Sequence, residues 1–334
     1  MSANSKVVAV YGATGHTGKF VVAELLRRGL SVIAVGRDMS RMPAGVTARL
    51  AGIDDGEALD RAFAGSSVVI NCAGPFLDTV APVVEAALRA GSAYIDVTAE
   101  QASALSTFER YDRRARDIGA AVIPAAGFYG GLADLLASAL VGEGTADDMT
   151  VAIALDHWWP TEGTRKTGER NRVPRVVVEN GSLVPMVVPA AKTAWTFAAP
   201  HGVQAMEAMP FSEIITISRH LHVRNLRAYL NASSLNDIRD ATTSAPVAVD
   251  MHGRSAQQFA MEVVARDSSG TRRAIARGQD IYAVTAPLVV EAAARMLQPS
   301  FRRSGALALG EAFDAEDFLR SFTPEHLTFQ LDAS

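Results

Sequence analysis

Short apolar runs alternate with longer amphipathic segments along the first 130 residues of this chain. The candidate strands are KVVAVY, SVIAVG, TARLAGI, SVVINCAG, AYIDVT and AAVIPAA. The candidate helices run from about His16 to Arg28, from about Thr79 to Ala90, and through FERYDRRARDIG. Apolar strands separated by helices are typical of a parallel sheet that is covered on both faces. The sequence therefore predicts a doubly wound α/β domain.

A glycine-rich loop, GATGHTG, follows the first candidate strand and opens the first candidate helix. In this setting glycines allow a tight turn and a close approach of the backbone to a pyrophosphate at the helix N-terminus. A plain turn needs about one glycine rather than three at this spacing. We therefore interpret the loop as the phosphate-binding turn of a Rossmann-type domain. The residues expected to bind the cofactor here are Gly12, Ala13, Thr14, Gly15, His16, Thr17 and Gly18.

The second strand ends with Arg37 and Asp38, which bear on the choice of cofactor. An arginine at this strand tip can pair with a ribose 2′-phosphate, whereas an acidic residue accepts from the 2′-hydroxyl. Arg37 favours NADP(H), although a solvated arginine is the alternative and Asp38 keeps NAD(H) open. Asp54, after the third strand, is either an adenine contact or a plain loop residue.

The loops after the later strands lie on the same predicted edge of the sheet, where ligands bind in such folds. Small residues in NCAGPF allow the backbone to approach a ribose or nicotinamide. Cys72 has no histidine neighbour in sequence, so we interpret it as a packed small residue rather than a nucleophile. The residues expected to border the cofactor in these loops are Cys72, Ala73, Gly74, Pro75, Phe76, Thr98 and Phe128.

The second half of the chain has the pattern of a mixed or antiparallel β-sheet. MTVAIALDHW, RVVVENGSLVPMVV, SEIITISRHLHVRNLRAYL and QFAMEVVARDSSGTRRAIARG resemble strands, and Asn180-Gly181 and Ser268-Ser269-Gly270 indicate hairpin turns. VTAPLVVEAAARML and AEDFLRSF return to helical periodicity. We expect a Rossmann domain over residues 1–140, an α+β capping domain with a mixed sheet over 141–278, and C-terminal helices over 279–334 that return to the first domain.

Four stretches resemble the saccharopine dehydrogenase-like oxidoreductases: YGATGHTG, NCAGPF, YIDVTAE and AAGFYGGLADLLA. The resemblance extends along most of the chain and is specific over the first 140 residues. It implies an NADP(H)-binding Rossmann domain, a mixed-sheet domain that caps the cofactor, and final helices that rejoin the first domain. The chemistry of this family includes reduction of C=N bonds and, in its trans-acting enoyl reductase branch, of C=C bonds.

Hydride transfer from a nicotinamide needs a positioned acceptor and usually a proton source. The Tyr-x-x-x-Lys pair of short-chain dehydrogenases is absent, because no tyrosine has a lysine four residues later. Tyr129 is the first candidate for proton donor or substrate contact, and a ring packed against the cap is the alternative. His157 is a candidate acid or a structural histidine. Lys166, expected in a turn with Arg165, is a carboxylate ligand or a solvated charge.

These candidates predict an NAD(P)H-dependent reductase that acts on the imine or conjugated C=C bond of a small metabolite. The competing hypothesis is an NADP-binding redox sensor without turnover, because NmrA-like regulators also combine GATGHTG with an arginine after the second strand. The length of the β-rich second domain and the NCAGPF loop favour the enzyme.

Composition excludes several other classes. A net charge of -4 gives no basic surface for nucleic acid or an anionic membrane, and one cysteine excludes an internal disulfide. No apolar run has the length of a membrane span, and MSANSKVVAV does not resemble a signal peptide. We expect a cytoplasmic protein, with a homodimer as a further hypothesis. His220 and His222 are expected on one face of a strand, without a third ligand, so no metal site is expected.

Overall fold

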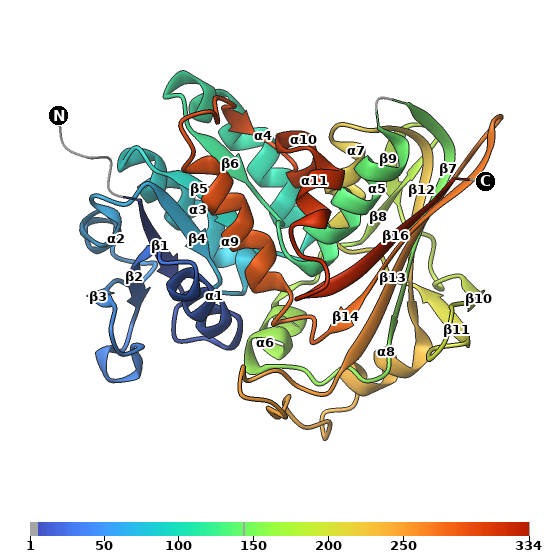
Figure 1. Cartoon of the computed structure of the whole chain (residues 1–334), viewed down its shortest axis with the longest axis horizontal. Helices are drawn as coiled ribbons and strands as arrows, with labels where there is room; N and C mark the ends of the chain where they lie inside the picture. The colour runs from blue at the N-terminus through green and yellow to red at the C-terminus, as the bar shows by residue number, and fades with distance from the viewer. Residues whose placement is uncertain (1–5, 143, 334) are drawn as a thin grey trace.

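The computed structural model describes residues 6–142 and 144–333. Figure 1 shows a parallel sheet with its helices on the left and a large curved second sheet on the right. In spatial order, the strands of the parallel sheet are β15 (Gly305–Ala306), β6 (Ala121–Ile123), β5 (Ala93–Asp96), β4 (Val68–Asn71), β1 (Val7–Tyr11), β2 (Ser31–Gly36) and β3 (Thr47–Leu50). Apart from the added β15, this is the strand order of a doubly wound Rossmann sheet, which confirms the predicted fold class.

The centre of the parallel sheet is the point where its winding reverses. β1 pairs with β2 on one side, with Val7 opposite Ser31, and with β4 on the other, with Val8 opposite Val68. The chain runs from β1 through β2 to β3 on one side of the sheet. It then crosses to the other side of β1 and continues outward from β4. Ligands of open α/β sheets bind outside the carboxyl ends of the strands at such a reversal.

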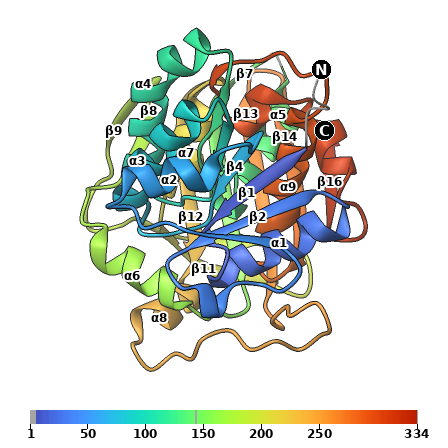
Figure 2. The same cartoon turned by 90° about the vertical axis from the view of Figure 1, so that its left-hand side faces the viewer.

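Helices cover both faces of this sheet, as Figure 2 shows. Successive strand residues point to opposite faces, so Val8 and Val10 pack with one hydrophobic cluster and Ala9 and Tyr11 with the other. The helices on the first side are α1 (His16–Arg27), α9 (Thr285–Met296) and α5 (Ala133–Val141), and those on the second are α2 (Gly56–Phe63), α3 (Phe76–Arg89) and α4 (Gln101–Asp117). The apolar strand segments noted in the sequence are therefore buried from both sides.

The second sheet is mixed. Its main path is β10 (Lys192–Thr196), β11 (Val203–Ala208), β12 (His222–Asn231), β7 (Thr145–Leu155), β13 (Gln258–Asp267), β14 (Gly270–Gln279) and β16 (Leu327–Ala333). β12 runs parallel to β7 and the other pairs along this path are antiparallel. β8 (Val176–Glu179) pairs with β12 and forms a hairpin with β9 (Ser182–Pro185). Asn180 and Gly181 in that hairpin have positive φ angles of 49° and 76°, as a two-residue hairpin turn requires.

Several short helices differ from the sequence prediction. SEIITIS was expected as a strand but forms α7 (Glu213–Ser218). Ile214 and Ile217 pack with one hydrophobic cluster and Ile215 with the other. The segment is therefore buried on several sides, and its apolar residues do not form the single stripe that identifies a helix. The expected turn around Lys166 is instead α6 (Glu162–Arg170), which has no buried residue to reveal it. The remaining short helices are α8 (Ala232–Arg239), the 3₁₀ segment η1 (Met39–Arg41) and the π-helical segment η2 (Phe128–Leu132).

The C-terminal segment contributes a strand to each sheet. α9 packs against α1, β15 adds to the edge of the parallel sheet, and α10 (Leu309–Ala312) and α11 (Ala315–Arg320) pack against α5. β16 then adds to the second sheet beside β14. The sequence prediction named only helices in this segment and omitted both strands, of which GA is too short to recognise.

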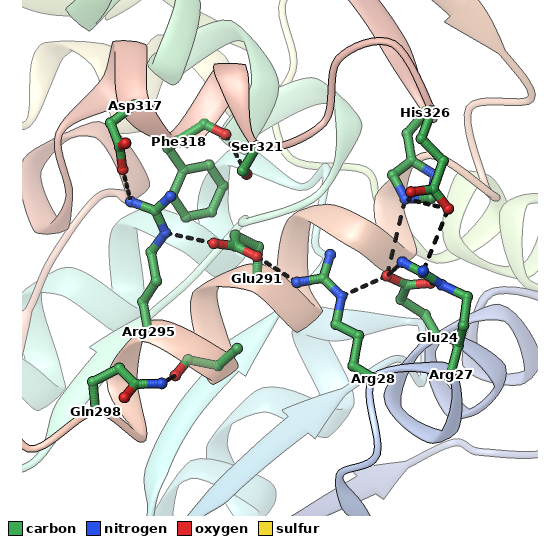
Figure 3. Close-up of polar contacts among 12 residues, drawn as sticks. Glu24, Arg27, Arg28, Glu291, Arg295, Gln298, Asp317, Phe318, Ser321 and His326 are labelled. Carbon is green, nitrogen blue, oxygen red and sulfur yellow. Dashed lines mark hydrogen bonds and ion pairs between the residues drawn. The ribbon is translucent and has the colours of Figure 1, made fainter.

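Charged side chains connect α1, α9 and α11 in a continuous chain, which Figure 3 shows in close-up. Glu24 accepts from Arg28 at 2.6 Å, Arg28 also pairs with Glu291, and Glu291 accepts from Arg295 at 2.7 Å. Arg295 extends the chain to Asp317 at 2.7 Å.

Among the helices of the described residues, none is both long enough and apolar enough to cross a bilayer.

Candidate functional site

A cavity of about 1220 Å³ lies at the carboxyl edge of the parallel sheet. Its wall includes the loops after β1, β2, β4, β5 and β6 on one side and residues from α6, α8, the segment before β8 and the segment before α9 on the other. The cavity therefore extends from the Rossmann domain to the capping domain, at the position where such sheets bind ligands.

The glycine loop is shaped for close backbone contacts. Gly12 has a φ of +79°, and a Cβ there would lie 2.9 Å from the Cβ of Ala73. A Cβ on Gly18 would lie 2.1 Å from the carbonyl oxygen of Gly12. Side chains at either position would disrupt the seat at the N-terminus of α1, so the loop fits a pyrophosphate group. Of the seven predicted loop residues, the cavity wall contains Gly12, Thr14, Gly15, His16 and Thr17, whereas Ala13 and Gly18 are buried behind it.

The tip of β2 presents arginine rather than aspartate to the cavity. Arg37 and Arg41 both line the cavity wall, and neither forms an ion pair with any described residue. Asp38 is exposed and caps η1, its Oδ1 accepting from the backbone nitrogen of Ser40 at 2.9 Å. Arg41 was not singled out from the sequence, although it lies four residues after Arg37. At the third strand Ile53 lines the cavity, whereas Asp54 is exposed and lies outside the wall.

The NCAGPF loop is fixed by buried polar groups. Asn71 Oδ1 accepts from the backbone nitrogen of Ala73 at 3.0 Å, and Thr79 donates to the Ala73 carbonyl at 2.6 Å. Glu100 caps α3 by accepting from the backbone nitrogen of Phe76 at 2.7 Å. Burial raises the pKa of the Cys72 thiol well above its usual range, which fits a packed residue rather than a nucleophile. All seven residues predicted in the later loops line the cavity: Cys72, Ala73, Gly74, Pro75, Phe76, Thr98 and Phe128.

α6 covers the cavity from the capping domain. Thr161 caps this helix by accepting from the backbone nitrogen of Thr164 at 3.1 Å. Arg170 at its other end pairs with Asp78 of α3 at 2.8 Å and joins the two domains. Lys166 lines the cavity but lies 2.5 Å from Glu162 of the same helix, and both side chains are exposed. Lys166, which was predicted to bind a carboxylate, is therefore already paired with the carboxylate of Glu162.

Aromatic rings surround Tyr129 at one end of the cavity. Its ring centroid lies 4.2 Å from that of Phe211, 5.1 Å from that of Phe128 and 5.9 Å from that of Trp158. The Tyr129 hydroxyl is buried without a hydrogen-bond partner among the described residues. Burial raises the pKa of Tyr129 well above its usual value, so the phenol keeps its proton.

Tyr282 borders the same aromatic region and was missed in the sequence. Its hydroxyl accepts from Trp158 Nε1 at 3.1 Å and lies 3.0 Å from Thr164 Oγ1 of α6. The ring of His16 meets it edge-on at 5.3 Å. Burial lowers the pKa of His16 although the nearby Asp280 opposes the shift, which favours a neutral imidazole. In the sequence, Tyr282 is marked only by its position between the last long strand-like segment and the helical segment that follows.

Arg175, directly before β8, was also missed. It lines the cavity with its guanidinium 4.7 Å from the centre of the Phe211 ring, and its Nη1 donates to the carbonyl of Pro210. Burial lowers the pKa of Arg175, and the carboxylate of Glu213 opposes that shift. No described carboxylate lies within ion-pair distance of it. The exposed-looking NRVPR sequence carries arginines at positions 172 and 175 and gave no indication that the second one enters the cavity wall.

Unlike His16, the histidines considered as an acid or as metal ligands, His157, His220 and His222, lie away from the cavity. His157 is exposed, stacks on Trp159 at 5.2 Å and faces Asp237 at 3.7 Å, outside the cavity wall. His220 and His222 do not share a strand face, which corrects the prediction. His220 precedes β12 and binds Asp134 at 2.7 Å, because the chain is still leaving α7 there. Within the described residues no group of three potential metal ligands forms.

These features define a dinucleotide-binding Rossmann protein with a β-rich capping domain. A family model described as NAD(P)H-binding matches residues 12–116. The sequence is 29% identical over 142 residues to a probable mitochondrial saccharopine dehydrogenase-like oxidoreductase of Arabidopsis thaliana, which covers 36% of this chain and 31% of that protein. It is 31% identical over 133 residues to the trans-acting enoyl reductase of Mycobacterium tuberculosis, covering 36% of this chain and 32% of that protein. These alignments span about a third of each relative.

The fold extends the likeness to almost the whole chain. The apo saccharopine dehydrogenase (L-Glu forming) of Saccharomyces cerevisiae superposes with a TM-score of 0.67 over 98% of this chain and 100% of that one, at 12% identity. The chain thus has the fold of that saccharopine dehydrogenase along nearly its full length, and its NAD(P)-binding part is similar in sequence to the saccharopine dehydrogenase-like oxidoreductase and the enoyl reductase. The resemblance drawn from the motifs is confirmed.

Proposed function

We propose that this protein is an NAD(P)H-dependent oxidoreductase that reduces the imine or conjugated C=C bond of a small metabolite. The observation that carries the proposal is the continuity of the cavity. One wall carries the backbone seat at Gly12 and Gly15, and another carries the enclosed aromatic group around Tyr129. A cofactor and an acceptor could therefore lie in one space. The oxidoreductase names of the relatives support the same reaction class.

The residues of the cavity have distinct roles in this proposal. A bound reduced nicotinamide supplies a hydride. The loop at the start of α1 binds the pyrophosphate, and the NCAGPF loop and Thr98 border the middle of the cofactor. The aromatic rings around Tyr129 orient an acceptor and exclude water from it.

Tyr129 is the proposed proton donor. Its ring lines the cavity, and its hydroxyl is protonated, covered by its neighbours and without a partner among the described residues. Donation to an atom that gains negative charge therefore requires the surrounding rings to shift when the acceptor binds. The structure offers no equivalent role to His157, which lies outside the cavity wall. We further propose NADP(H) as the cofactor, since Arg37 and Arg41 line the wall where Asp38 does not.

The proposal is tested by following NADPH oxidation with a panel of cyclic imines, enones, enoic acids and carbonyl compounds. We expect oxidation with imines or conjugated alkenes and little with isolated ketones. NADPH binding is measured separately by its effect on thermal unfolding. Stabilisation by NADPH without oxidation by any compound would contradict the enzyme and favour the NADP-binding redox sensor.

A further inference from the structure

The part of the cavity wall around Tyr129 includes Arg175, whose positive charge is not paired with any described carboxylate. Arg175 lies with its guanidinium over the Phe211 ring at 4.7 Å, and Tyr129 and Trp158 line the same region. Nη1 donates to the Pro210 carbonyl, whereas Nε and Nη2 have no acceptor among the described residues. These two nitrogens are not among the fully buried unpartnered atoms, and Arg175 lines the cavity wall.

The nearest acidic group does not neutralise Arg175. Glu213 is buried but lies beyond ion-pair distance, and its Oε1 accepts from the backbone nitrogen of Phe211 at 2.8 Å. Burial raises the pKa of Glu213 to about 7, so this carboxyl is only partly charged near neutral pH.

Three other cations on the cavity wall already have partners. Arg165 donates to the carbonyls of Thr243 and Asp240, Lys166 pairs with Glu162, and Arg239 pairs with Glu207. Arg175 is distinguished by its contact with the Phe211 ring and by its two nitrogens without an acceptor among the described residues. A desolvated guanidinium with two free donors is the side-chain arrangement that best recognises a planar carboxylate.

We propose that Arg175 is a specificity-determining residue that binds the carboxylate of an unsaturated monocarboxylate substrate with a flat apolar body. The inference rests on the proposed function and names its substrate class. The rings of Tyr129, Trp158 and Phe211 contact the body of the substrate, and the free edge of Arg175 binds its carboxylate. A second charge on the body would face these rings without a partner, so a compound with several charges is disfavoured.

Matched acids and amides test the class directly. Crotonate, trans-cinnamate and indole-3-acrylate are titrated into the NADPH-loaded protein by calorimetry, alongside their primary amides. Each acid should bind at least about tenfold more tightly than its amide, as expected for a hydrogen bond assisted by charge. Affinity should rise from crotonate to indole-3-acrylate as more apolar surface is buried. Equal affinity of acids and amides, or no binding of any acid, would overturn the inference.

Variants of Arg175 assign the preference to this residue. Arg175→Gln should lose the acid preference, and Arg175→Lys should keep only part of it, because an ammonium lacks the planar fork. Arg172→Gln is the matched control, since Arg172 is an exposed arginine on the same cavity wall. An acid preference that persists in Arg175→Gln would also overturn the inference. If Arg175→Gln does not fold, the comparison between Arg175→Lys and the wild type decides.

Cofactor binding separates this inference from the function on which it rests. NADPH affinity is measured for each variant without any acceptor, and we expect all of them to bind NADPH like the wild type. A wild-type protein that does not bind NADPH contradicts the proposed function. A protein that binds and oxidises NADPH but does not distinguish acids from amides contradicts only the role of Arg175.

Discussion

At the scale of single residues, Arg37 gives the sharpest test of cofactor choice. It lines the cavity without an ion-pair partner in the described part of the chain. Replacing it with alanine should weaken NADPH binding by about tenfold or more, because a charge-assisted contact to the 2′-phosphate is lost. NADH binding should change little. Fluorescence titration of both cofactors checks this, with Arg61→Ala on the exposed face of α2 as control. An equal loss for both cofactors would refute the role.

Gly18 tests the packing beneath the glycine loop. A Cβ there would lie 2.1 Å from the Gly12 carbonyl oxygen, so Gly18→Ala must displace the loop backbone. We expect a loss of about 1–3 kcal/mol in the free energy of unfolding, together with weaker NADPH binding. Gly56→Ala is the control, because a Cβ there has open space at the start of α2. Urea unfolding checks both, and an unchanged Gly18 variant would contradict the close packing.

Tyr129→Phe should separate stability from activity. The hydroxyl has no partner in the described structure, so its removal should leave the unfolding free energy unchanged or raise it by up to about 1 kcal/mol. Turnover should fall by about 100-fold or more if the phenol is the general acid. Thermal unfolding and steady-state rates check the two effects. Tyr111→Phe on α4, whose hydroxyl bonds Glu85 at 3.3 Å, is the control, and unchanged turnover would remove Tyr129 from the mechanism.

At the scale of elements, the buried carboxylate of Asp134 links α5 to the segment after α7 and to α10. Asp134 in α5 lies 2.7 Å from His220 Nε2, after α7, and accepts from the backbone nitrogen of Gly310 in α10 at 2.6 Å. Burial alone would lower the pKa of His220, but the charge and hydrogen bond of Asp134 outweigh it and raise the pKa. The ion pair is therefore complete only while His220 is protonated.

This pair gives stability a pH dependence of known sign. Because the pKa of His220 is raised in the folded state, the contribution of this ion pair to the free energy of unfolding is fully present below about pH 6.5, the ordinary pKa of histidine. It is lost as the pH rises through the raised pKa of the folded protein. We expect this slope in urea unfolding curves measured across that range, and a smaller slope in His220→Ala, because Glu213, with a pKa of about 7, also titrates there. His252→Ala, at an exposed position, should keep the slope. A His220→Ala protein with the wild-type slope would contradict the assignment.

The elements also show how far the sequence can predict this structure. The parallel sheet and its edge loops were predictable because buried strands, glycines and helix periodicity are local signals. α6 and α7 were not, since α6 has no buried face and α7 is buried on several sides. Arg175 and Tyr282 reach the cavity only through the packing of the capping domain. Their role depends on contacts between distant segments, which no local pattern records.

At the scale of the whole molecule, the charge chain of Figure 3 connects helices from the early and the late parts of the sequence. Glu291 faces both Arg28 of α1 and Arg295 of α9, and its side chain is 16% exposed. Glu291→Gln leaves two arginines without this carboxylate and should cost about 1–2 kcal/mol of unfolding free energy. Calorimetric melting checks this, with Glu57→Gln, in an exposed pair, as the control. A melting temperature equal to the wild type would show that the chain of charges contributes little.

The path of the C-terminal segment has a consequence for how the protein is made. β15 completes one sheet at residue 306 and β16 completes the other from residue 327. A ribosome adds residues at roughly 5–20 per second from the N-terminus, so β6 and β14 emerge well before the strands that cover them. Until β15 and β16 have been synthesised, β6 and β14 are unpaired edge strands, and such strands can pair with other chains. Translation that stops near residue 300 should release a product that aggregates through two edges at once.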